Sequence, residues 1–169
     1  MILKHSLPTA ALCVVFATAT VTAGEPGIDR WGKNESFDAM TDKRIVSAGV
    51  ATADGMILQF QCSGDRFGAV IAPFSPLVAL EFITMDDLSP VAWRIDSETA
   101  VTETWHVLPG RAGASYAVVS LDAADFAAAV MAGGQRLTFR VHGLTTSVPL
   151  QGAGGYVAEA VSACASPQP

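Results

Sequence analysis

The stretch of residues 56–62 constrains the fold of this chain more than any other. Its apolar side chains alternate with glutamines, so that Phe60 and Cys62 share one face of a predicted strand while Gln61 lies on the other. The Cys62 thiol therefore points toward a core. Cys164, near the other end of the chain, lies on the apolar stripe of a predicted C-terminal helix. We expect a disulfide between Cys62 and Cys164 that joins an early strand to a late helix.

Residues 1–23 have the features of a cleaved secretory signal peptide. Basic residues precede an apolar run at 10–21, and small residues stand before Gly24 at the positions that signal peptidase reads. The run is too short, and too rich in alanine and threonine, for a membrane-spanning helix of about 20 residues. We expect export to the periplasm or medium of a Gram-negative bacterium, with no stable membrane anchor after cleavage. Cys13 leaves with the signal, and a remaining cysteine pair in an exported chain favours a disulfide.

The composition predicts one β-rich domain at residues 24–165, followed by a frayed tail at 166–169. The chain has 169 residues, of which 50% are hydrophobic, enough to bury a core in a single domain. The formal net charge is −6, so the basic surface of a nucleic-acid-binding protein is absent. We expect no nucleic-acid partner.

Alternating strand patterns separated by turn residues run through most of the chain. Strands are predicted at residues 45–52, 56–62, 66–72, 91–96, 102–108, 115–120 and 135–142, with a further candidate at 77–84. An irregular or edge-strand segment precedes them, held to the body by Trp31 and Phe37. Two short helices come late, one after an Asp122 cap and one at 156–164. The fold class is mainly β: an antiparallel β-sandwich or curled sheet, with two short helices packed at its edge and one disulfide.

No motif predicts catalysis or a cofactor. The histidines His106 and His142 have no neighbours at metal-ligand spacing, the serines lie outside a nucleophile elbow, and the glycines near residue 154 lack a phosphate-loop lysine. We therefore predict no metal, no cofactor and no catalytic residue.

The outward side of the later strands is the best candidate for a binding surface. Arg94, Arg140 and His142 share a solvent face if their strands are neighbours, and Trp105 is a candidate to line a groove beside them. Trp93 alternates with Arg94 and is predicted to point inward. The alternative interpretation is an ordinary charged sheet face.

Short motifs follow one another in order from residue 31 to residue 164. They are Trp31, Ser-Phe-Asp-Ala-Met-Thr-Asp-Lys at 36–43, the strand ending on Cys62, Val-Ala-Trp-Arg-Ile-Asp at 91–96, Trp105, Gly143-Leu144 and Cys164. This order resembles the VasI/TagO family of type VI secretion-associated proteins. Gln61 and Trp93 stand where that family has a basic residue and commonly a tyrosine, and no tryptophan follows Cys164. The related invasion-associated locus B family has a similar strand-rich plan and cysteine use.

The resemblance implies a periplasmic, non-enzymatic accessory domain that contacts a protein partner in the cell envelope. The resemblance implies no particular ligand and no catalytic residue. The alternatives are an envelope virulence protein of the locus B type and an exported cell-wall enzyme or enzyme inhibitor. A cleft of polar groups around His106 or His142 would favour the enzyme, and a face carrying Arg94 and Arg140 would favour binding.

Overall fold

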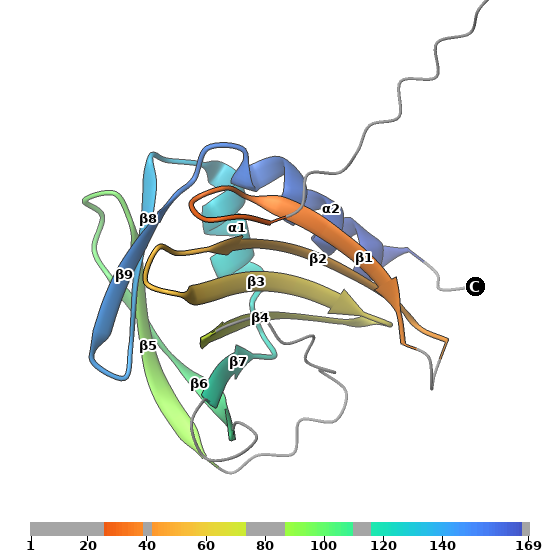
Figure 1. Cartoon of the computed structure of the whole chain (residues 1–169), viewed down its shortest axis with the longest axis horizontal. Helices are drawn as coiled ribbons and strands as arrows, with labels where there is room; N and C mark the ends of the chain where they lie inside the picture. The colour runs from red at the N-terminus through yellow and green to blue at the C-terminus, as the bar shows by residue number, and fades with distance from the viewer. Residues whose placement is uncertain (1–25, 39–41, 74–86, 110–115, 167–169) are drawn as a thin grey trace, which may run out of the picture.

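A single antiparallel sheet forms most of the molecule. The computed structural model describes residues 26–38, 42–73, 87–109 and 116–166. The strands in chain order are β1 (Gly32–Phe37), β2 (Arg44–Ala51), β3 (Met56–Ser63), β4 (Arg66–Pro73), β5 (Leu88–Ile95), β6 (Val101–Pro109), β7 (Tyr116–Ser120), β8 (Arg136–Val141) and β9 (Leu144–Pro149), and the helices are α1 (Ala124–Ala132) and α2 (Ala153–Ala165). The nine strands have the order β1-β2-β3-β4-β7-β6-β5-β8-β9 (Figure 1).

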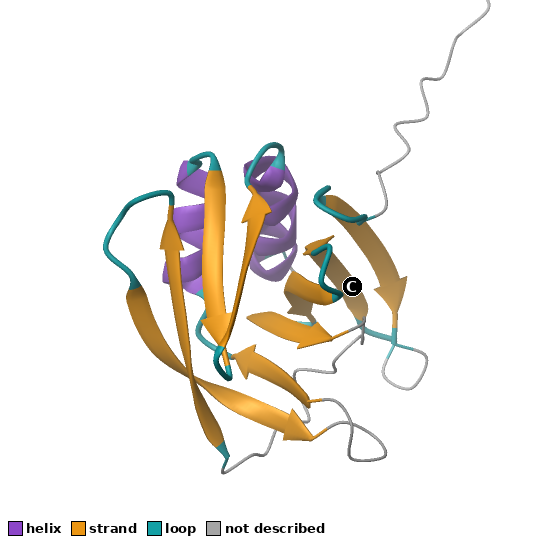
Figure 2. Cartoon of the chain, turned by 60° about the vertical axis from the view of Figure 1, so that its left-hand side comes forward, coloured by secondary structure: helices purple, strands orange, loops and turns teal. Residues whose placement is uncertain are grey.

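The sheet curls around the two helices, which fill its concave side (Figures 1 and 2). Helix α2 contacts β2, β3 and β4, and α1 packs against α2. The mainly β, antiparallel class is confirmed, in the form of one continuous curled sheet. The predicted position of the helices at the edge of the sheet is wrong, because their apolar faces complete the core.

Phe126 of α1 lies at the centre of that core. Its ring centroid is 5.0 Å from that of Phe60, 4.9 Å from that of Trp93 and 5.8 Å from that of Trp105. Strand alternation directs Phe60 and Trp93 inward, as the sequence predicts. Aromatic rings from β3, β5 and β6 therefore pack on a single helical side chain and hold the two halves of the sheet together.

The predicted disulfide between Cys62 and Cys164 is confirmed, with a Cα–Cα distance of 5.5 Å. It joins the end of β3 to the last turn of α2. This helix begins at Ala153, earlier than predicted, and includes Gly154 and Gly155. Gly154 has a packing role there, because a Cβ atom at this position would lie 3.3 Å from the backbone oxygen of Met131 in α1.

The outer face of β3 is buried as well. Gln61 is 0% exposed, and the side-chain nitrogen of Gln59 donates a hydrogen bond of 3.3 Å to the side-chain oxygen of Gln61. Val70 of β4 and Val119 of β7 belong to a second, smaller apolar cluster. Strand β3 is therefore covered on both faces, which an alternating pattern of apolar and polar residues does not predict.

Two local predictions fail at the ends of elements, and one strand was not predicted. Trp31 is buried, and its indole nitrogen donates a 2.7 Å hydrogen bond to the backbone oxygen of Pro149, but Phe37 is 65% exposed and does not hold β1 to the body. Asp122 does not cap α1, because the N-cap residue is Ala123 and makes no side-chain capping bond. Strand β9 was not predicted. The proposed strand at 77–84, the signal peptide at 1–23 and the end of the tail at 167–169 lie outside the described residues.

Candidate functional site

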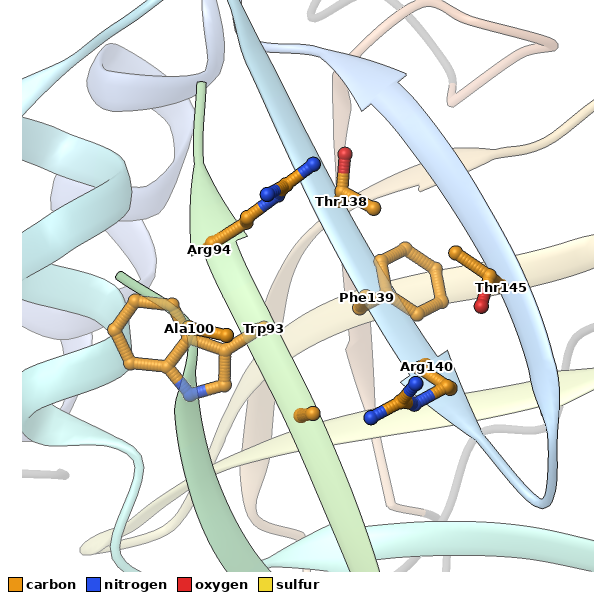
Figure 3. Close-up of a pocket in the computed structure, with 8 residues that line it drawn as sticks. Trp93, Arg94, Ala100, Thr138, Phe139, Arg140 and Thr145 are labelled. Atoms are coloured by element: carbon orange, nitrogen blue, oxygen red, sulfur yellow. The ribbon is translucent and has the colours of Figure 1, made fainter. Parts of the chain in front are cut away.

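The antiparallel pairing of β5 with β8 places Arg94 and Arg140 on the same outer face of the sheet. Trp93 pairs with Phe139, and both side chains are buried in the core. The residues that follow them, Arg94 and Arg140, therefore point to the convex side, where both are exposed. The two strands are neighbours, as the prediction of a common arginine-bearing face requires (Figure 3).

A shallow hollow of about 230 Å³ lies on this face. Besides the core residues Trp93 and Phe139, it is lined by six residues that we call the arginine face: Ala92, Arg94, Ala100, Thr138, Arg140 and Thr145. Thr145 belongs to β9 and pairs with Arg140, so the face spans β5, β8 and β9. Small side chains and hydroxyl groups surround the two guanidinium groups, which leaves the charged groups accessible from solvent.

The arginine face is cationic on a protein of net charge −6. Within the described ranges of the chain, no ion pair joins Arg94 or Arg140 to a carboxylate. Arg44 differs, because its Nε donates a 2.6 Å hydrogen bond to Glu35 on the neighbouring strand. That hydrogen bond is the main reason why the pKa of Glu35 lies below its usual value. The guanidinium donors of the arginine face remain available to a ligand or partner.

The other two predicted members of the patch lie elsewhere. Trp105 is 1% exposed and belongs to the core, so the prediction that it lines a surface groove is wrong. His142 lies beyond the end of β8, in a two-residue turn with Gly143, and the φ angles of His142 and Gly143 are 48° and 80°. Positive φ at both positions forms the tight hairpin to β9. The imidazole is exposed at the tip of this hairpin and does not line the hollow.

Glu103 explains why the two tryptophans are buried. Its carboxylate oxygens accept hydrogen bonds from the indole nitrogens of Trp93, at 3.0 Å, and Trp105, at 2.8 Å. A buried indole needs an acceptor, and one carboxylate serves both. The spacing of Glu103 and Trp105 puts them on one face of β6, but the partnership with Trp93 depends on the pairing of β5 with β6. Sequence reasoning missed this residue for that reason.

A second hollow, of about 430 Å³, lies beside His106 and is lined mainly by polar residues. His106 of β6 and Ser120 of β7 both line it, together with Glu103, Asp122 and Asp125. The Ser120 oxygen accepts a 3.3 Å hydrogen bond from the backbone nitrogen of Asp122. A cleft of polar groups around His106 is the feature that would favour an enzyme.

Asp54 links the β2–β3 hairpin to β9 by a hydrogen bond, where the two ends of the curled sheet come close together. Its carboxylate accepts a hydrogen bond from the Thr52 hydroxyl and another, of 3.3 Å, from the Thr146 hydroxyl. The bond from Thr52, and less strongly that from Thr146, holds the pKa of Asp54 below its usual value against the opposing effect of partial burial. The ionised carboxylate therefore stabilises the strand that carries Thr145 of the arginine face.

Asp54→Asn is expected to remove a pH-dependent part of the stability. The pKa of Asp54 is lower in the folded state than in the unfolded state. Its contribution to the free energy of unfolding is therefore fully present above the ordinary aspartate pKa of about 3.9 and is lost as pH falls through the lower folded value. The variant should be less stable at neutral pH by less than about 1 kcal/mol, since Asp54 is exposed. Urea unfolding from about pH 7 to about pH 3 should show this difference shrinking in acid. A difference independent of pH, or an equal pH dependence in Asp65→Asn, an exposed turn control, would contradict the assignment.

Comparisons with protein-family models, curated proteins and solved structures find no match to this chain. Neither helix in the described part of the chain is long and apolar enough to cross a membrane. Among the same residues, no three histidine, cysteine or acidic side chains gather in a way that could hold a metal ion.

Proposed function

We propose that this chain is an exported periplasmic accessory protein that binds a protein partner in the cell envelope through the arginine face. The protein acts by contact and not by catalysis. It has no stable membrane anchor once the signal at residues 1–23 is removed. The order of motifs that resembles the VasI/TagO family supports an association with a type VI secretion system.

The observation that carries this proposal is the exposure of Arg94 and Arg140 on two hydrogen-bonded strands. Arginine is enriched at the energetically important positions of protein interfaces, and here the sheet fixes the backbone of both arginines before a partner arrives. The Cys62–Cys164 disulfide is compatible with export, since such bonds persist in oxidising compartments.

Two alternative functions are also proposed: a different envelope-binding protein, and an enzyme or enzyme inhibitor. An envelope protein of the locus B type would use the same surface, and the identity of the captured partner separates it from a secretion accessory. An exported cell-wall enzyme or enzyme inhibitor would use the polar hollow beside His106, whose lining includes Ser120 and Asp125.

A comparative pull-down tests the arginine face. Tagged wild-type protein and the Arg94→Ala plus Arg140→Ala variant are used as baits in periplasmic extract, and bound proteins are quantified by mass spectrometry. The variant should recover about tenfold less of the specific partner, because paired arginines of this kind contribute a large share of an interface's free energy.

The matched control is Arg30→Ala plus Arg66→Ala, which removes the same charge from two exposed positions away from the arginine face. The control should recover the partner at the wild-type level. Thermal unfolding of all three proteins establishes that each is folded. Equal recovery by the Arg94/Arg140 variant and the wild type contradicts the proposed function.

A further inference from the structure

The register of β5 and β8 restricts the chemistry of the partner. Ala92 is directly opposite Arg140, and Thr138 is directly opposite Arg94. The two arginines are therefore diagonal neighbours on one face, and such neighbours lie about 7–8 Å apart. Ala92 lies beside both arginines on this face and has no bulk that would keep a ligand from spanning them.

An extended peptide offers the same spacing. Its alternate side chains point to one side and stand about 6.5–7 Å apart. Carboxylates at positions i and i+2 would each meet one guanidinium group, whose planar donors match a carboxylate in a bidentate pair. The hydroxyl group of Thr145 borders the hollow and can donate to a backbone oxygen of such a segment, whereas the Thr138 hydroxyl is hydrogen-bonded to that of Ser147 at 2.9 Å.

We propose that the arginine face binds an extended acidic segment of the partner protein, with carboxylates on alternate residues paired to Arg94 and Arg140. This inference rests on the proposed function and adds the chemistry that the partner must present. The segment lies across the outer face of β5 and β8, with its other side open to solvent.

The charge of the whole protein favours a narrow peptide over an anionic membrane or polymer. With a net charge of −6, most of the surface repels an extended layer of negative charge. Screening limits the reach of a surface charge to about 8 Å at physiological ionic strength. Two carboxylates held against Arg94 and Arg140 therefore experience mainly the local positive charge.

The test is fluorescence anisotropy with two labelled peptides of equal composition. One alternates glutamate with threonine, and the other has its glutamates in one block flanked by threonines. The wild-type protein should bind the alternating peptide more tightly than the block peptide. Arg94→Gln plus Arg140→Gln should bind it about tenfold more weakly, while Arg30→Gln plus Arg66→Gln, with the same change in net charge, should bind as the wild type does.

Each other outcome overturns this inference. Equal affinity for the two peptides would show that binding does not depend on carboxylates at alternate positions. Equal binding by the two double variants would show that the arginine face is not the binding site. Binding of wild type, but not of Arg94→Gln plus Arg140→Gln, to phosphatidylglycerol–phosphatidylcholine vesicles in place of the peptide assigns the face to a lipid surface. If the pull-down depends on Arg94 and Arg140 while the alternating peptide does not bind, the inference fails and the proposed function stands.

Discussion

Loss of the Cys62–Cys164 disulfide is expected to lower the free energy of unfolding by about 4–5 kcal/mol, because the bond closes a long loop in the unfolded chain. The closed loop spans a sequence separation of 102 residues and contains most of the sheet. Without the bond, the last turn of α2 is held to β3 only by packing. Replacement of both cysteines by alanine avoids placing a hydroxyl group at Cys62, which is buried. Urea unfolding at neutral pH measures the difference.

Reduced wild-type protein is the matched control for this prediction. It retains both sulfur atoms in the core, so it isolates the effect of the cross-link from that of the lost side-chain volume. The reduced protein and the double-alanine variant should both unfold at clearly lower urea than the oxidised protein. If oxidised and reduced wild type unfold at the same urea concentration, the bond does not stabilise the fold as we expect.

Phe126→Ala should destabilise the protein by about 3–5 kcal/mol, the usual cost of removing a buried aromatic ring and leaving a cavity. Phe126 contacts the rings of Phe60, Trp93 and Trp105, which come from three different strands. Its loss therefore weakens the packing of both halves of the sheet on α1. Urea unfolding followed by tryptophan fluorescence measures this effect, since two of the neighbouring rings are indoles.

Phe37→Ala is the control, because it deletes the same atoms from a side chain that is largely exposed on β1. A surface substitution of this kind should change stability by no more than about 0.5 kcal/mol. Phe126→Leu, which keeps an apolar side chain in place, should lose less than Phe126→Ala. Equal stability of the alanine variants at positions 126 and 37 would show that the aromatic cluster does not hold the sheet to the helix.

Local patterns predicted the strands well where the chain turns back directly on itself. Asp54 and Gly55 mark the hairpin between β2 and β3, and Gly55 has the positive φ of 85° that such a turn requires. Strand β9 was missed because its threonines and terminal proline read as a loop, and because the turn at His142 and Gly143 lacks the usual asparagine or aspartate.

The candidate site was predicted in part. Alternation alone placed Trp93 inward and Arg94 outward, since one face of β5 is buried and the other is not. The same reasoning offered Trp105 as a residue that lines a surface groove, because the polar Glu103 shares its face of β6. The pairing of β5 with β6 places the Glu103 carboxylate beside two indole nitrogens, and Trp105 is therefore buried.

The sequence by itself determined the alternation of the strands, the inward direction of Cys62 and the antiparallel β class, because these depend on residues close together in the chain. Only the tertiary structure decided that β5 lies between β6 and β8, and so that Arg94 and Arg140 share one surface. Pairing between strands distant in sequence depends on how the whole sheet curls around α1 and α2, and no local pattern encodes it.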